Sequence, residues 1–153
     1  MMRTALICLL ASILGAGSAR ADGTGTVSTG AFRQAYAASF YQFDACGDGL
    51  AGRIYRNALT ARLRQCPFPA DAKTQFQTWA KAQARKSGQA IKAMIDDNGG
   101  MPIRLQGMAR TCREQIDSPE YRTVRERLDT YASGKSTPDA VVPQPCDADA
   151  ITP

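Results

Sequence analysis

The sequence contains no histidine among its 153 residues, and this absence excludes several kinds of chemistry at once. A histidine general base, a histidine-ligated zinc and a haem attached through C-x-x-C-H are all ruled out. The chain also lacks the apolar run of about 18 residues that a membrane-spanning helix requires. Aromatic residues make up only 7% of it, whereas 44% is apolar and 22% charged. This composition is typical of one small globular domain.

The first 21 residues have the pattern of a secretory signal peptide. Arg3 gives a positive start, residues 5–14 are apolar, and residues 19–21 (Ala-Arg-Ala) provide a small-residue cleavage site. The alternative, a buried N-terminal helix, fits less well because the segment has no polar face. We therefore expect cleavage before Asp22 and export to the periplasm or the extracellular space. The net charge would fall from +5 to +3, because two arginines are lost.

Cleavage would also remove Cys8 and leave four cysteines: Cys46, Cys66, Cys112 and Cys146. An even number of cysteines in a small exported domain predicts two disulfides. A zinc site is the weaker interpretation, because the shortest spacing between these cysteines is twenty residues and no C-x-x-C pair occurs. We expect neither a metal nor a cofactor.

Apolar residues recur at helical spacing along most of the mature chain, and no useful β-alternation occurs. The pattern predicts helices beginning near Ala31, Asp48, Pro69, Pro102 and Ser118, and Gly134 ends the last of them. We expect an all-α bundle of about five helices stapled by disulfides. Residues 22–30 would be a flexible leader, 31–134 the helical domain, and 135–153 a Pro-rich extended tail tethered by Cys146.

Helix lengths discriminate among the three ways of pairing four cysteines. Cys46 and Cys66 flank the second helix, which separates them by roughly 24 Å, far beyond the ~7 Å that a disulfide spans between Cα atoms. If the second, third and fourth helices are antiparallel neighbours, Cys112 lies at the height of Cys46. The tail can then bring Cys146 to Cys66, because its dozen residues reach up to ~40 Å. We therefore predict the pairs Cys46–Cys112 and Cys66–Cys146.

Positive charge is concentrated between Leu50 and Ile95, a stretch that contains nine basic residues and a single acidic one, Asp71. Such a run is often only a solvated surface. The functional interpretation is a docking surface for an acidic protein, an anionic lipid or a polyanion such as a polysaccharide. Nucleic acid is excluded, because the compartment is wrong and no aromatic residues interleave the charges. The candidate partner-binding residues are Arg53, Arg56, Arg62, Arg64, Lys81, Arg85 and Lys92.

Catalytic motifs are scarce. No nucleophile–histidine pair can exist, and no G-x-S-x-G, P-loop or H-E-x-x-H motif occurs. A carboxylate pair for glycoside hydrolysis could be drawn from Asp44, Asp48, Glu114 and Glu120, but Asp44 and Asp48 are better explained as helix caps. We therefore predict no catalytic residues.

These features predict a non-catalytic periplasmic interaction protein. The most plausible role is a small accessory or stabilising subunit docked on a larger periplasmic assembly, such as an oxidoreductase complex. The alternative is a binder of anionic lipid or polyanion through the basic helical hairpin. A carboxylate-dependent hydrolase is the remote alternative.

Overall fold

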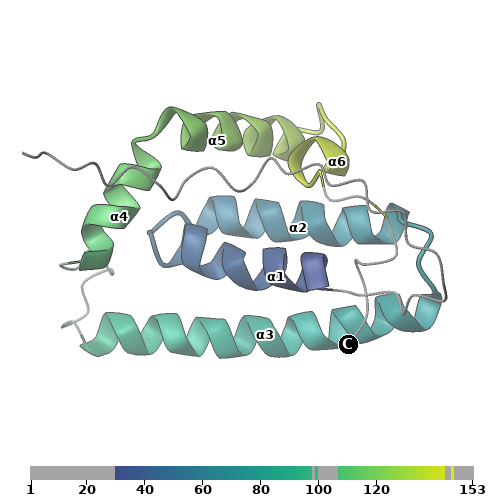
Figure 1. Cartoon of the computed structure of the whole chain (residues 1–153), viewed down its shortest axis with the longest axis horizontal. Helices are drawn as coiled ribbons and strands as arrows, with labels where there is room; N and C mark the ends of the chain where they lie inside the picture. Colours follow the sequence, from purple (N-terminus) through teal and green to yellow (C-terminus); the bar gives the residue numbers. More distant parts are fainter. Residues whose placement is uncertain (1–29, 98, 100–106, 144–145, 147–153) are drawn as a thin grey trace, which may run out of the picture.

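A computed structural model describes residues 30–97, 99, 107–143 and 146 of the chain. The predicted signal peptide and nearly all of the predicted leader lie outside these residues. The described part is all-α and contains no strand (Figure 1). Its elements in order are α1 (Gly30–Ser39), the π-helix η1 (Phe40–Asp44), α2 (Gly49–Gln65), α3 (Ala70–Asp97), α4 (Gly107–Ile116), α5 (Pro119–Ala132) and α6 (Pro138–Val141).

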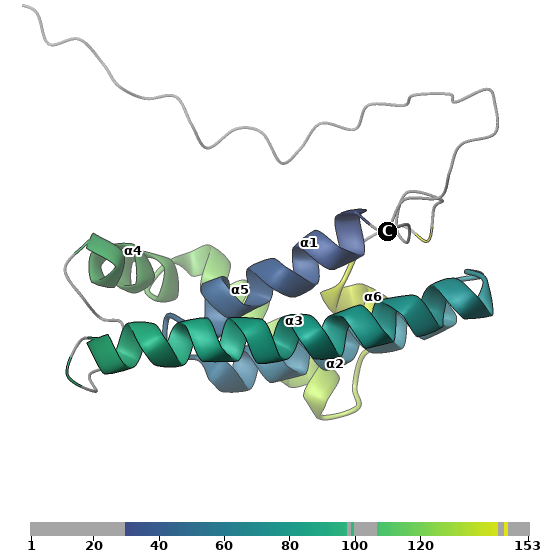
Figure 2. The ribbon, with the colours of Figure 1, turned by 90° about the horizontal axis from the view of Figure 1, so that it is seen from below.

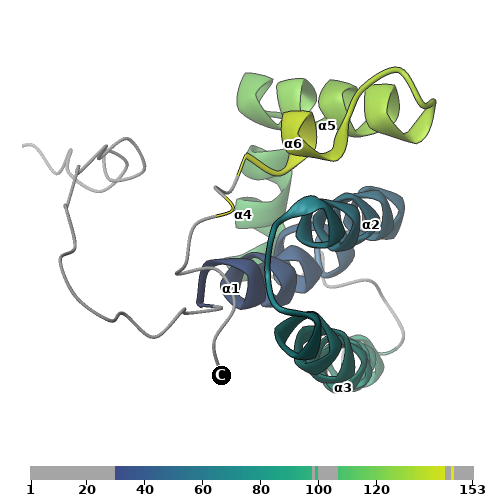
Figure 3. The ribbon, with the colours of Figure 1, turned by 90° about the vertical axis from the view of Figure 1, so that its right-hand side faces the viewer.

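The helices form two layers. α1, α2 and α3 run side by side in alternating directions, and seen from the end they form a triangle (Figures 1 and 3). α1 contacts both of the other helices, and α3 also packs on η1. α5 and α6 cover a further side of α2, and α4 connects the two layers at one end of the bundle. Figure 2 shows α3 lying across the face of the molecule opposite α5.

The helix boundaries follow local capping rules, as the sequence predicted. The Asp48 carboxylate accepts a hydrogen bond from the backbone N–H of Ala51 at 3.0 Å, which caps α2. The Ser118 hydroxyl accepts one from the N–H of Tyr121 at 3.1 Å, and Pro119 occupies the first turn of α5. Gly134 follows α5 with φ +73°, a conformation that costs glycine little.

Two clusters of buried side chains form the core. The larger one lies inside the α1–α2–α3 triangle, around the fully buried Phe32, Leu59, Leu63 and Phe76. The smaller cluster joins α2 to α5 and is formed by Phe43, Ala51, Tyr121 and Leu128. α2 therefore contributes to both clusters and is the central helix of the molecule.

The π-helix η1 is a feature that the sequence pattern did not predict. Here the backbone N–H groups of Ala45 and Asp48 donate to the carbonyls five residues earlier, those of Phe40 and Phe43, both at 2.9 Å. Immediately before it, the buried Ser39 hydroxyl donates to the Tyr36 carbonyl at 2.7 Å. The wider turn presents Asp44 to α2 while Phe40 and Phe43 remain buried.

Both predicted disulfides are confirmed. Cys46 pairs with Cys112 and Cys66 pairs with Cys146, each with a Cα–Cα separation of 5.1 Å. They tie the chain at opposite ends of α2. One premise of the prediction was wrong, because α4 packs against α5 instead of lying in a row with α2 and α3. The predicted pair Cys46–Cys112 is nevertheless correct, because α4 begins at the end of the bundle where α3 ends (Figure 1).

The described part of the Pro-rich tail, residues 135–143 and 146, is not extended throughout, although the sequence predicted an extended tail. Pro138–Val141 forms the short helix α6, because Pro138 suits the first turn of a helix. Val142 follows and is fully buried in the larger core cluster. This part of the tail is therefore packed against α2 and α5 as well as tethered through Cys146.

Candidate functional site

Five of the seven predicted partner-binding residues are exposed on α2 and α3. We call them the basic surface: Arg53 and Arg64 on α2, and Lys81, Arg85 and Lys92 on α3.

Each helix presents its part of the basic surface on one face. At 100° per residue, Arg53 and Arg64 lie within about 20° of each other around α2. Lys81, Arg85 and Lys92 fall within about 40° of one another on α3, on the side away from its buried stripe. That stripe consists of Phe76, Ala80, Ser87 and Ile91.

Most of these charges are not neutralised by an ion pair. Lys92 pairs with Asp96 one turn further along α3. Within the described residues, Arg53, Arg64, Lys81 and Arg85 make no ion pair. The four cations are therefore available to a partner and contribute a positive potential to the exposed faces of α2 and α3.

Arg56, one of the seven candidate partner-binding residues, is not part of the basic surface. Its side chain is only 11% exposed and lies between η1 and α2. Nη1 donates to Oδ2 of Asp44 at 2.7 Å, and Nη2 donates to Oδ1 at 3.1 Å, which gives a bidentate ion pair. Nη1 also donates to the Ser39 hydroxyl, and the guanidinium lies 4.0 Å from the centroid of the Phe40 ring. Arg56 is therefore a structural residue.

Arg62 is also not part of the basic surface. Its side chain is half-buried, and its Nε is buried without a hydrogen-bond partner among the described residues. It lies near α6: the pKa of the Asp139 carboxyl is lowered first by a hydrogen bond from Thr137 and, to a smaller extent, by the charge of Arg62. Arg62 thus faces the tail.

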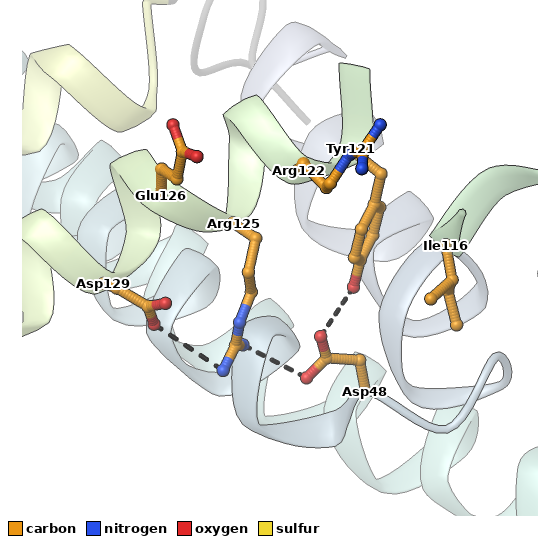
Figure 4. Close-up of a pocket in the computed structure, with 7 residues that line it drawn as sticks. All are labelled: Asp48, Ile116, Tyr121, Arg122, Arg125, Glu126 and Asp129. Carbon is orange, nitrogen blue, oxygen red and sulfur yellow. Dashed lines mark hydrogen bonds and ion pairs between the residues drawn. The ribbon is translucent and has the colours of Figure 1, made fainter. Parts of the chain in front are cut away.

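A hollow of about 370 Å³ lies where α5 meets the start of α2 (Figure 4). Asp48 is one of the residues that line it. Its carboxylate accepts a hydrogen bond from the Tyr121 hydroxyl at 2.7 Å and one from Arg125 Nη1 at 3.1 Å, and Arg125 also pairs with Asp129. Burial, and then the hydrogen bond to Asp48, raise the pKa of Tyr121, which keeps the phenol protonated as a donor. This network, which the sequence analysis missed, fastens α5 to α2.

Two of the four candidate carboxylates are held by partners inside the fold: Asp44 pairs with Arg56, and Asp48 with Tyr121 and Arg125. Glu114 makes only an exposed pair with Arg110 on the surface of α4, and Glu120 is exposed. The expectation that Asp44 acts as a helix cap was wrong, since its carboxylate pairs with Arg56 of α2. These interactions give Asp44 and Asp48 a stabilising role.

A second hollow, of about 250 Å³, lies between α2 and α3. The sequence pattern gives no sign of it, because its apolar residues recur at the spacing of ordinary core residues. It is lined by Tyr36, Thr60, Phe76, Gln77, Ala80 and Lys81.

No protein-family model, curated protein or solved structure matches the chain. None of the helices in the described part has the length and apolar character needed to cross a bilayer. The two disulfides fit a secreted or extracellular protein.

Proposed function

We propose that this chain is a non-catalytic interaction protein of the periplasm, an accessory or stabilising subunit that docks on a larger assembly through its basic surface. The observation that carries the proposal is the set of four exposed cations on α2 and α3 without an ion-pair partner: Arg53, Arg64, Lys81 and Arg85. Unneutralised charge of one sign favours the encounter with a surface of opposite sign. The partner is therefore a protein with an acidic surface.

The scaffold beneath this surface supports a binding role. Disulfides hold both ends of α2, and the ion pair of Arg56 with Asp44 holds its middle to η1. A rigid scaffold loses little conformational entropy when it binds, so more of the interaction energy appears as affinity.

Affinity purification from the native envelope tests the proposal. The triple variant Arg53→Glu, Arg64→Glu and Arg85→Glu is compared with the wild type at low and at high salt. We expect the wild type to retain a stoichiometric protein at low salt and to lose it as salt rises, because the attraction is screened over about 8–10 Å. The triple variant should recover at least fivefold less of that protein.

The matched control is the double variant Arg122→Glu and Arg127→Glu, which changes exposed arginines on α5. It should recover the partner as the wild type does. Recovery that is equal in all three proteins would overturn the role of the basic surface. Recovery of anionic lipid or polysaccharide without a protein would favour the polyanion-binding alternative instead.

A further inference from the structure

The hollow between α2 and α3 lies where α1 packs beside both helices. α1 contacts α2 and α3 and closes the space between them on one side (Figure 3). We call this hollow the α2–α3 groove. Its floor is formed by Tyr36 of α1 with Phe76 and Ala80 of α3, and its walls by Thr60 of α2 with Gln77 and Lys81 of α3.

The floor of the groove is the edge of the core. Phe76 is fully buried beneath it, whereas Tyr36 and Ala80 keep a small part of their surface exposed and are the floor side chains that a ligand can reach. The Phe76 ring supports the Tyr36 ring edge-on at a centroid distance of 6.0 Å. Trp79 packs against both rings from behind, at 5.6 Å from Phe76 and 5.8 Å from Tyr36. A volume of about 250 Å³ over such a floor has room for one large apolar side chain.

Polar groups around this floor are free to bind. The Tyr36 hydroxyl makes no hydrogen bond to any described residue. The Thr60 hydroxyl donates to the Arg56 carbonyl at 2.9 Å and keeps its acceptor lone pairs. The exposed Gln77 amide and Lys81 ammonium complete the rim. Three of these four side chains can donate to a carboxylate.

The rim is positively charged along its length. Lys73, one turn before Gln77, donates from Nζ to the Arg64 carbonyl at 3.0 Å and connects the two walls at one end. Arg64 lies one turn beyond Thr60, and Arg85 lies one turn beyond Lys81. Asp71 is the only acid in the sequence between Leu50 and Ile95.

We propose that the α2–α3 groove binds an acidic peptide segment of the partner protein, with one large apolar side chain of that segment placed against Tyr36 and Ala80 at its floor. Charge complementarity selects carboxylates for the rim, and the apolar floor distinguishes a peptide from a polysaccharide, which has no such anchor. This inference rests on the proposed function and specifies the part of the partner that is recognised.

Selection from a phage-displayed library of random twelve-residue peptides tests the inference. The target is the full chain, produced by export so that both disulfides form. We expect the enriched peptides to be acidic and to share one large apolar residue. A synthetic peptide of the enriched sequence should bind the wild type in a fluorescence anisotropy titration.

Two variants and a matched control locate the binding site. Gln77→Trp fills the groove from its exposed wall, and Lys81→Glu reverses the charge of the rim. Each should weaken the peptide at least tenfold. Lys86→Glu makes the same charge change at another exposed position of α3, away from the groove, and should change binding less than twofold. Circular dichroism checks that all three variants remain folded.

Enrichment of peptides that are not acidic, a failure to enrich any peptide, or binding that Gln77→Trp leaves unchanged would overturn the inference. Its failure is distinguishable from failure of the proposed function. The binding of a native partner could depend on Arg53, Arg64 and Arg85 but be unchanged by Gln77→Trp. That result would support the proposed role of the basic surface and contradict the proposed role of the groove.

Discussion

At the scale of single residues, Arg56 shows how a charge can belong to the core of a small protein. Its guanidinium satisfies both oxygens of Asp44, the Ser39 hydroxyl and the face of the Phe40 ring. Partly buried charges of this kind are costly to desolvate, so the pair adds less stability than its contacts suggest. Removal of one partner is severe, because the other charge is left buried and unpaired.

We therefore expect Arg56→Glu to lower the free energy of unfolding by about 3 kcal/mol or more, since it places two carboxylates together. Arg64→Glu, the same change on an exposed residue of the same helix, should cost less than about 0.5 kcal/mol. Urea denaturation followed by circular dichroism at 222 nm measures both. Equal losses in the two variants would contradict the structural role of Arg56.

Gly52 provides the space that this ion pair needs. A Cβ atom at this position would collide with Asp44 Oδ2 and would lie 2.9 Å from Arg56 Nη1 and 3.1 Å from the Cβ atom of Phe43. Gly52→Ala should therefore destabilise the protein by about 1–3 kcal/mol, despite the better helix propensity of alanine.

Gly88 is the matched control, because it lies inside α3 with nothing within 4 Å of the added Cβ atom. Gly88→Ala should stabilise the protein by about 0.5–1 kcal/mol. Thermal and urea unfolding of the two variants give the comparison. Stabilisation by both substitutions would show that the region around Asp44 can rearrange at little cost.

At the scale of helices, the sequence predicted most of the fold but not the fine position of its parts. Caps such as Asp48 and Ser118 act within one turn, so their effect can be deduced from neighbouring residues alone. The π-helix could not be deduced in this way, because it depends on contacts between η1 and a helix that follows it. Arg56 lies seven residues before the fully buried Leu63 and about 20° from it around α2, so it belongs to the buried side of that helix and faces η1.

The candidate site was likewise predicted only in part, because its arrangement depends on how the helices pack against one another. Composition located the excess of positive charge, and five of the seven chosen residues are exposed. The α2–α3 groove could not be predicted, because the apolar residues of its floor recur along the sequence at the same spacing as the residues of a closed core. The groove is evident only once the positions of α1, α2 and α3 in space are known.

At the scale of the whole molecule, the two disulfides fix two different attachments. Cys46–Cys112 holds α4 to the turn after η1, where the Gln115 amide also donates to the Gln42 carbonyl at 3.0 Å. Cys66–Cys146 holds the tail beside the end of α2, where Val142 fills the larger core cluster. The basic surface and the groove lie on the helices between these attachments.

Removal of either disulfide should lower the free energy of unfolding by about 4 kcal/mol, because the loops that the two disulfides close are similar in length, 66 and 80 residues. Urea denaturation of the two paired Cys→Ser variants measures this loss.

The two paired Cys→Ser variants should nevertheless differ in which helix opens more readily. Hydrogen exchange should accelerate in α4 when Cys46 and Cys112 are replaced, and in α6 when Cys66 and Cys146 are replaced, because each region loses its covalent attachment. The protected amides of α2 should still open together in both variants, since both core clusters include this helix. Acceleration spread evenly over all helices would show that neither disulfide acts locally, and that the two layers of the bundle unfold as one unit.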